Sequence, residues 1–340
     1  MTLESIIKKT LNRTSLTQVE SKILFTNIMD GKIEDATLKK ILINMSEKGE
    51  TSEEITGGAE VLREKCLKIN LSGEIIDTCG TGGDGKNTIN ISTASALLLA
   101  AMRNKVAKHG NKSVSSNCGS ADVLEKLKIK IDLNPNDAEK YFKKNNFIFM
   151  FAPLYHSAMK NVANVRKELK KRTIFNLLGP LCNPANVNRQ CIGVFSNEIL
   201  EKYIQVLKKL GTKKAWVFHS EDGLDEISIF SKTKVYELNN NEITSFEINP
   251  NTIIQNEYRF DDIVGKDAEY NAQQIIDLFK GKNGALNEIV SLNTAAGLLV
   301  LDKFSNLKEA YSYTKDFLNS GKAFKPIPKD RDKANIKIFL

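Results

Sequence analysis

The spacing of apolar residues separates an N-terminal stretch from the rest of the chain. In residues 1–70 the apolar positions recur at helical spacing, as in the face made of Leu38, Ile41, Leu42 and Met45. Gly49 follows this face. Thr17 with Glu20 and Thr51 with Glu54 are typical of capping boxes that open helices. This stretch is therefore predicted to form about three or four helices, with no evident chemistry of its own.

From residue 74 onward, short apolar runs alternate with helical stretches. Residues 147–151 are an unbroken apolar run, which is typical of a strand buried on both faces. The alternation predicts a mainly parallel sheet with helices on both faces. The strands are expected at residues 75–76, 105–110, 147–151, 189–195 and 215–219. The helices are expected at residues 89–100, 122–127, 136–144, 197–210, 271–279, 285–301 and 307–319.

Residues 227–248 have a third pattern. Short β-type runs at 227–230, 234–238 and 243–246 are separated by polar turns and predict an antiparallel meander. The basic tail after Gly321 is expected at the surface. Together the patterns predict an α/β fold. A small all-helical N-terminal domain covers residues 1–72, and a large α/β domain with a mainly parallel central sheet covers residues 73–340.

The amino-acid composition indicates which partners and which cellular compartment to expect for this protein. The net charge of +8 allows a polyanionic partner, but the lysines are scattered among acids, so we interpret them as a solvated surface. Five cysteines without a CxxC pair predict a reducing compartment and no disulfide framework. The N-terminus does not resemble a signal peptide, and the longest apolar run, residues 94–102, is too short to span a bilayer. A cytoplasmic protein is expected.

The densest cluster of candidate chemistry follows the first expected strand. Four glycines fall within six positions, residues 80–85, between that strand and a buried helix. Glycines let backbone N–H groups approach an anion, and a helix N-terminus adds a favourable dipole. A tight turn without a ligand would not need the polar side chains of Thr81, Asp84, Asn87 and Thr88. We interpret the loop as a phosphate cradle.

Three further polar groups follow expected strands or lie on a helix, where a doubly wound sheet can bind ligands. Residues 108–116 and 119–120 offer lysines, hydroxyls and an amide, which suit either phosphate oxygens or a solvated loop. Asp225 and Glu226 are adjacent carboxylates, which beside a phosphate site would suit Mg²⁺ and otherwise form a charged turn. Arg166 is either a surface residue or a bidentate ligand for a carboxylate.

Spacing argues against three common enzyme classes. None of the three histidines, His109, His156 and His219, has partners at the spacing of a hydrolase triad. The glycine loop lacks the GxxxxGK[ST] pattern of P-loop nucleotidases. Gly80, Gly82 and Gly85 fall at the GxGxxG spacing of dinucleotide-binding folds, but the acid about 20 residues further on that such folds use is missing.

In order and spacing, the motifs resemble those of the anthranilate phosphoribosyltransferase family. The resemblance runs from about residue 20 to residue 325 and is carried by residues 80–85, 90–93, 108–116, 172–185, 225–226 and 292–296. It implies transfer of the phosphoribosyl group of 5-phosphoribosyl 1-pyrophosphate to the amine of anthranilate, in tryptophan biosynthesis. It also implies a fold shared with pyrimidine nucleoside phosphorylases and a homodimer built through the helical domain. A segment at about residues 165–185 should return to that domain.

The resemblance also implies the site residues. Phosphoribosyl pyrophosphate would contact Gly80, Gly83, Asp84, Thr88, Asn90, Ile91, Ser92, Thr93, Lys108, His109, Gly110, Asn111, Lys112, Ser113, Val114, Ser115, Ser116 and Ser120. Mg²⁺ would bind Ser92, Asp225 and Glu226. Anthranilate would contact Gly80, Asn111 and Arg166, while Lys108 and His109 would support catalysis. Departures from the usual family residues at Cys79, Lys112, Ser157, Lys170 and Thr294 remove none of these ligands.

Phosphoribosyl transfer to anthranilate fits the site residues that the resemblance implies, among which no strong base is evident. The aromatic amine of anthranilate is neutral at pH 7, so positioning and electrostatic stabilisation are expected to supply most of the rate. Two alternatives stay open: a nucleic-acid-binding homologue without transferase activity, and a pyrimidine nucleoside phosphorylase. Under the favoured interpretation, neither nucleic acid nor a membrane is a partner.

Overall fold

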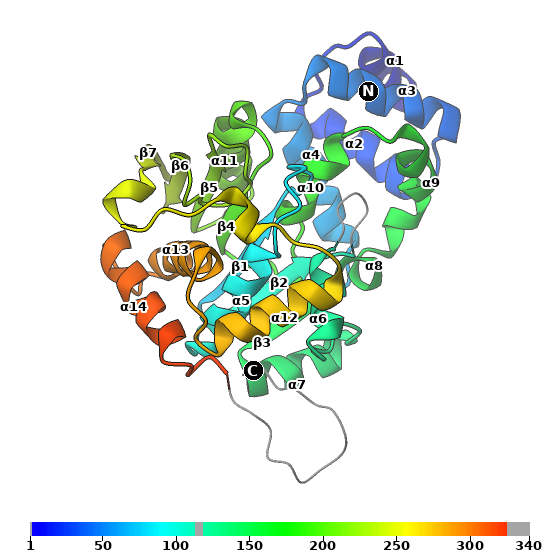
Figure 1. Cartoon of the computed structure of the whole chain (residues 1–340). Helices are drawn as coiled ribbons and strands as arrows, with labels where there is room; N and C mark the ends of the chain where they lie inside the picture. The colour runs from blue at the N-terminus through cyan, green and yellow to red at the C-terminus, as the bar shows by residue number, and fades with distance from the viewer. Residues whose placement is uncertain (1, 113–117, 325–340) are drawn as a thin grey trace.

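The computed structural model describes residues 2–112 and 118–324 and places the N-terminal helices in one bundle (Figure 1). They are α1 (Leu3–Leu11), α2 (Gln18–Met29), α3 (Asp35–Lys48) and α4 (Ser52–Lys65). Both predicted capping boxes are present: Thr17 and Thr51 each exchange hydrogen bonds with the glutamate three residues later. The prediction of an all-helical beginning is confirmed.

The central sheet has seven strands in the order β3-β2-β1-β4-β5-β6-β7. The first five in this order are parallel to their neighbours, and the last two are antiparallel. The mainly parallel sheet is therefore as predicted. The strands are β1 (Ile75–Gly80), β2 (Lys105–Gly110), β3 (Phe147–Phe151), β4 (Arg189–Gly193), β5 (Lys214–Ser220), β6 (Thr233–Asn239) and β7 (Glu242–Ile248).

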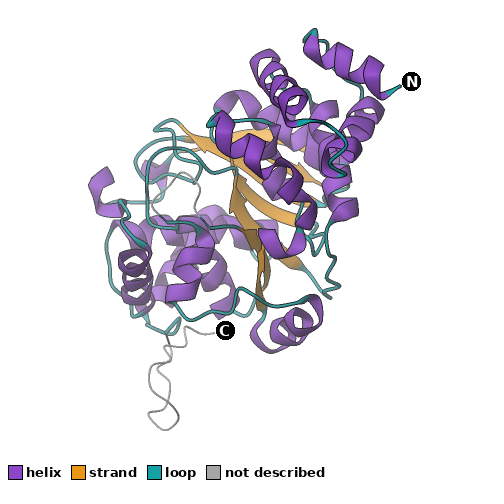
Figure 2. Cartoon of the chain, turned by 90° about the vertical axis from the view of Figure 1, so that its right-hand side faces the viewer, coloured by secondary structure: helices purple, strands orange, loops and turns teal. Residues whose placement is uncertain are grey.

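Helices cover both faces of this sheet (Figure 2). One face carries α5 (Ile91–Ala101), α6 (Ser120–Lys126), α12 (Ala268–Phe279), α13 (Ala285–Val300) and α14 (Leu307–Asn319). The other face carries α7 (Pro135–Asn145), α8 (Ala152–Tyr155) and α11 (Leu200–Lys209). Two helices, α9 (Lys160–Leu169) and α10 (Ile174–Leu178), leave the sheet and pack against the N-terminal bundle.

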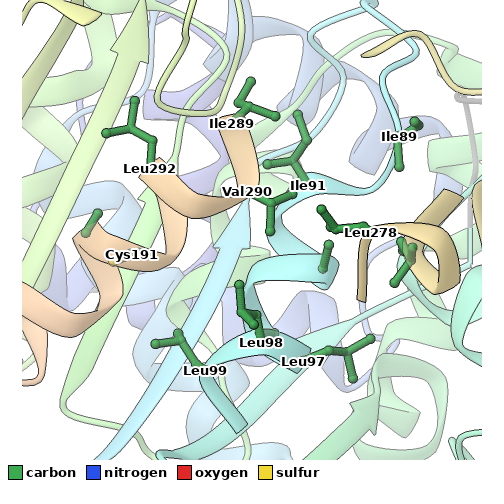
Figure 3. Packing of buried hydrophobic residues seen from close by; sticks show 14 of the residues in the cluster. Ile89, Ile91, Leu97, Leu98, Leu99, Cys191, Leu278, Ile289, Val290 and Leu292 are labelled. Atoms are coloured by element: carbon green, nitrogen blue, oxygen red, sulfur yellow. The ribbon is translucent and has the colours of Figure 1, made fainter. Parts of the chain in front are cut away.

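Helix α5 fixes the position of the loop before it. Its side chains are buried on every side, and Leu97, Leu98 and Leu99 lie in a cluster with residues of α13 (Figure 3). A helix that is apolar all round belongs in a core. Gly297 allows α13 to approach, because a Cβ there would lie 2.8 Å from a Leu99 methyl carbon. The N-terminus of α5 is thereby held beside the end of β1.

The bundle and the sheet share one apolar core. A single cluster joins Phe25 and Leu62 of the bundle to Leu178 of α10, Leu207 of α11 and Val217 of β5. Helix α9 contacts α2 and α3, and α10 contacts α3 and α4. The boundary at residue 72 and the returning segment at about residues 165–185 stay predictions about domain division.

The prediction of a strand at residues 227–230 is wrong. That segment is a loop, and the meander consists of β5, β6 and β7 alone. Side chains take the backbone groups that a neighbouring strand would have paired. The N–H and C=O of Ile227 both bond the Asn293 amide at 2.9 Å, and the Ser228 N–H bonds Ser220 Oγ at 3.2 Å. Alternating residue types alone do not reveal such competition.

None of the helices in residues 2–112 and 118–324 combines the length and apolar character needed to cross a bilayer. All five cysteines are free. Most of the tail expected at the surface, residues 325–340, lies outside the described residues.

The contact between α2 and α4 gives a test of the bundle. A Cβ at Gly57 would lie 2.6 Å from the Gln18 carbonyl oxygen and 2.9 Å from the Lys22 nitrogen, both backbone atoms. At Gly58 the nearest atom, at 3.3 Å, is a side-chain methyl carbon of Leu178, which would need to move by only a few tenths of an ångström. Gly57→Ala should therefore unfold more easily than Gly58→Ala by about 1–3 kcal/mol in chemical denaturation. Both changes gain the same helix propensity, so equal midpoints would contradict this packing.

Candidate functional site

Apart from Arg166, the expected site residues that the structure describes lie at one edge of the sheet, where parallel strands end. The glycine loop follows β1, residues 111–120 follow β2, and Asp225 with Glu226 lies beyond β5. Ligands of open α/β sheets bind at this edge.

Two strand ends are glycine because residue 225 passes directly over them. A Cβ at Gly193 would lie 1.6 Å from the Asp225 carbonyl oxygen, and one at Gly80 would lie 2.7 Å from Asp225 Oδ2. The Gly82 N–H donates to that same Oδ2 at 3.1 Å. Gly82 and Gly83 have φ of +67° and +78°, which suits glycine. The glycine loop and the acid pair are thus one structure.

The acid pair is electrostatically strained. Burial, and then the Asp84 carboxylate, raises the pKa of Asp225 to about 7. Burial, and then Asp225, raises the pKa of Glu226, whose side chain is 8% exposed. The Ser92 N–H, in the first turn of α5, donates to Glu226 Oε1 at 3.0 Å. Clustered oxygens that resist ionisation fit a divalent cation, which would relieve their repulsion.

Only two of these proposed magnesium ligands, Asp225 and Glu226, are acidic. In the described part of the chain, no group of three His, Cys, Asp or Glu side chains is arranged to hold a metal. Mg²⁺ usually takes one or two carboxylates and completes its shell with water and substrate phosphates. The two carboxylates with the Ser92 hydroxyl meet that requirement.

Lys108 lies between the strand ends and helix α5. Its side chain is only 2% exposed, and Nζ donates to the Thr78 carbonyl and lies 3.5 Å from Ser92 Oγ. Its charge acts on both Asp77 and Glu226, since it lowers the pKa of each carboxyl group against the larger effect of burial. Lys108 is therefore a buried cation next to the end of β1 and the first turn of α5.

Asp77 is a buried acid that the sequence analysis did not select, and its hydrogen bonds connect the elements at this edge of the sheet. Burial raises its pKa to about 6. Its carboxylate accepts from Asn183 Nδ2 at 2.8 Å and from the His109 N–H at 3.3 Å. The same Asn183 amide donates to the Ala107 carbonyl at 2.8 Å. Asp77 thus joins β1, β2 and the loop before β4. Its position inside an apolar strand was the available signal.

His109 is a neutral side chain in this structure. Burial, and then the neighbouring His156, lowers its pKa to about 3. The two rings lie 5.0 Å apart, and His109 Nδ1 lies 3.2 Å from the Gly179 carbonyl oxygen, so Nδ1 carries the proton. Among the residues that the structure describes, Nε2 has no hydrogen-bond partner, although it is buried. A histidine with so low a pKa is a weak base at pH 7.

At the start of α5, backbone groups rather than side chains are the main candidates for contact with a ligand. Ile91 and Thr93 are buried, so their side chains face the core. The Asn90 amide is engaged, since it donates to the Cys118 carbonyl at 3.1 Å and accepts from Asn271 at 3.0 Å. Thr88 pairs with Val264 in an isolated antiparallel bridge.

The loop after β2 is only partly described. Asn111 and Lys112 are exposed, and Lys112 Nζ lies 3.1 Å from a Glu125 carboxylate oxygen. Ser120 Oγ donates to the Asn111 carbonyl at 3.3 Å. The remaining predicted phosphate ligands of this loop lie outside the described residues: Ser113, Val114, Ser115 and Ser116.

Arg166 comes from α9 on the returning segment. Its guanidinium is partly buried 5.5 Å from the centre of the Phe175 ring, and burial lowers its pKa. No contact joins Arg166 to the glycine loop within residues 2–112 and 118–324, whereas Arg172 donates to the Gly83 carbonyl. Sequence reasoning included Arg172 only as part of a motif and assigned it no role.

The raised pKa of Asp225 has a measurable effect on the metal-free protein. Its usual value of 3.8 applies in the unfolded chain, so the folded state holds the proton more tightly. Stability should therefore fall as pH rises from about 4 to about 7. Asp225→Asn should raise the free energy of unfolding by about 1–3 kcal/mol at pH 8 but not at pH 4.

The control for this measurement is Glu221→Gln, an exposed acid five residues before Glu226. Thermal unfolding in a chelator compares the three proteins at both pH values. An equal gain for Asp225→Asn at pH 4 and pH 8 would show that its charge is not the cause.

Comparisons with known proteins agree along most of the chain. The helical bundle domain of the glycosyl transferase family matches residues 4–66, and the a/b domain of that family matches residues 72–324. The chain is 50% identical over 318 residues to the anthranilate phosphoribosyltransferase of Pelagibacter ubique, which covers 94% of this chain and 96% of that protein.

Solved structures give the same result. The anthranilate phosphoribosyltransferase of Thermus thermophilus has a TM-score of 0.87 and 34% identity, over 93% of this chain and 95% of that one. The enzyme of Saccharomyces cerevisiae in complex with PRPP and Mg has a TM-score of 0.86 and 25% identity, over 94% of each chain. The chain therefore belongs to the anthranilate phosphoribosyltransferases of the glycosyl transferase family.

Proposed function

We propose that this protein transfers the phosphoribosyl group of 5-phosphoribosyl 1-pyrophosphate to the amine of anthranilate. The products are N-(5-phosphoribosyl)anthranilate and pyrophosphate, in tryptophan biosynthesis. The observation that carries the proposal is the contact of the glycine loop with Asp225, beside the buried Lys108, in a chain of this family. The yeast relative with bound PRPP and Mg supports the donor and the metal.

The donor would lie over the end of β1 and the start of α5. The backbone N–H groups of Gly83 and Asp84, those at the start of α5 apart from the Ser92 N–H that donates to Glu226, and the Lys108 ammonium would supply hydrogen-bond donors and positive charge on the side where α5 begins. Asn111, Lys112 and Ser120 would close the phosphate site from the loop after β2. Donors and positive charge of this kind suit a pyrophosphate, which supports the proposed position of the donor.

Asp225, Glu226 and Ser92 would hold Mg²⁺, whose chemistry is to neutralise charge on the leaving pyrophosphate. The residues of this chain supply the rest. Lys108 and the backbone donors bind the leaving group, so that the C1–oxygen bond can break as the amine nitrogen approaches C1. The amine is neutral at pH 7, and the arylammonium that it becomes on bonding to C1 is acidic enough to lose its extra proton to water or to the released pyrophosphate. The low pKa of His109 agrees with a site that provides no strong base.

Anthranilate would be oriented by Arg166, with Asn111 and the backbone at Gly80. An arginine binds a planar carboxylate through two parallel hydrogen bonds. The partial burial of Arg166 near Phe175 limits competition from water. The comparisons give no support to a nucleic-acid-binding protein or a pyrimidine nucleoside phosphorylase.

We also propose that the protein is a homodimer built through the helical domain and that it resides in the cytoplasm. Both proposals rest on the family resemblance and the composition of the chain. Sedimentation velocity at micromolar concentration tests the first, and a monomer there would contradict it.

Purified protein with phosphoribosyl pyrophosphate and Mg²⁺ should remove the fluorescence of anthranilate with time, because the amine becomes substituted. A chelator should stop the decay, and excess Mg²⁺ should restore it. No decay in the complete mixture would exclude the proposed reaction.

Arg166→Ala should raise the KM for anthranilate about tenfold or more, since a charged hydrogen bond contributes about 1.5–3 kcal/mol. The KM for the donor should change less than twofold. Lys167→Ala, an exposed change on the same helix, is the control. A loss confined to the donor would show that Arg166 does not bind the acceptor.

A further inference from the structure

Arg172 contacts the glycine loop from the segment between α9 and α10. Its guanidinium donates to the Gly83 carbonyl and lies 4.1 Å from the centre of the Phe195 ring. The Phe195 N–H in turn donates to Thr81 Oγ1 at 3.1 Å. Two residues from outside the loop therefore hold it at two points, and they contact each other.

The loop itself is poorly constrained by its sequence. Gly82, Gly83 and Gly85 are exposed and have positive φ of +67°, +78° and +74°. Glycine loses more conformational freedom on ordering than any other residue. At the Gly83 carbonyl, Arg172 supplies a restraint from a different part of the chain. A loop ordered before the ligand arrives binds it more tightly.

The other side of Arg172 is attached to the helical bundle. Its carbonyl accepts from Ser46 Oγ of α3 at 3.1 Å. The planar guanidinium can stack on the Phe195 ring while it donates a hydrogen bond, which an ammonium group cannot do in the same geometry. The residue thus connects α3, the end of β4 and the glycine loop.

We propose that Arg172 is a positioning residue that holds the glycine loop ready for the pyrophosphate of the donor. The proposal rests on the proposed function and assigns to Arg172 a role distinct from that of Arg166. Arg172 acts through the Gly83 carbonyl and through its stacking on Phe195, not through the acceptor.

Steady-state kinetics of Arg172→Gln test this role. The KM for phosphoribosyl pyrophosphate should rise about fivefold to tenfold, and the KM for anthranilate should change less than twofold. The KM of Arg172→Lys for phosphoribosyl pyrophosphate should stay at least about threefold above that of the parent, because lysine keeps the charge but loses the planar contact. Full recovery by lysine would overturn the proposal, since charge alone would then be sufficient.

Phe195→Leu provides a variant that removes the ring and adds no group able to reach the substrate. It should raise the donor KM about twofold to threefold alone, and should have no further effect in the Arg172→Gln background. Equal effects in both backgrounds would contradict a shared role. Lys171→Gln, which removes a neighbouring exposed charge, should leave both KM values unchanged.

The outcomes separate this inference from the function itself. If the parent protein shows no anthranilate-dependent reaction, the proposed function fails. If the parent is active, Arg172→Gln is folded by circular dichroism, and its donor KM is unchanged, the positioning role alone fails.

Discussion

The close passage of residue 225 over the ends of β1 and β4 is the constraint on which the site depends. Gly80 and Gly193 leave room for the Asp225 backbone and carboxylate, and any side chain at Gly193 would occupy the space of the Asp225 carbonyl. That passage brings the acid pair against the glycine loop. Without it, the two motifs would be separate loops at the same edge of the sheet.

Around this contact the protein concentrates charge that water would otherwise surround. Asp77, Lys108 and Glu226 are nearly inaccessible, and burial raises the pKa of both acids. Such an arrangement costs stability in the empty protein and is balanced when opposite charges bind. Fixed donors and charges of this kind need little rearrangement as charge develops on a leaving group.

Much of the fold could be predicted from the sequence, because apolar periodicity reports burial directly. The wholly apolar strand β3 and the largely buried α5 have strong patterns of this kind. Residues 227–230 have a β-type pattern too, but hydrogen bonds from Asn293 and Ser220 decide their conformation. Asn293 lies 66 residues from Ile227 in the sequence, so its part in this conformation could not be anticipated.

The site residues, like the elements of the fold, could be predicted where the signal is local in the sequence. Motifs that are continuous in sequence, such as residues 80–85 and the acid pair, were selected because their chemistry is local. Asp77 and Arg172 were missed as functional groups, since their roles depend on Asn183, Phe195 and Ser46, which reach them only through the fold. A buried carboxylate within an apolar strand was a signal, whereas Arg172 offered none beyond its motif.

Because the bundle and the sheet share one core, the chain cannot be shortened or fused to another protein at every position. Leu62 of α4 and Leu207 of α11 belong to one apolar cluster, which continues into β5. A fragment that starts after residue 70 would expose this surface to water and would aggregate instead of behaving as a module. A fusion partner can therefore not take the place of the bundle without uncovering this surface.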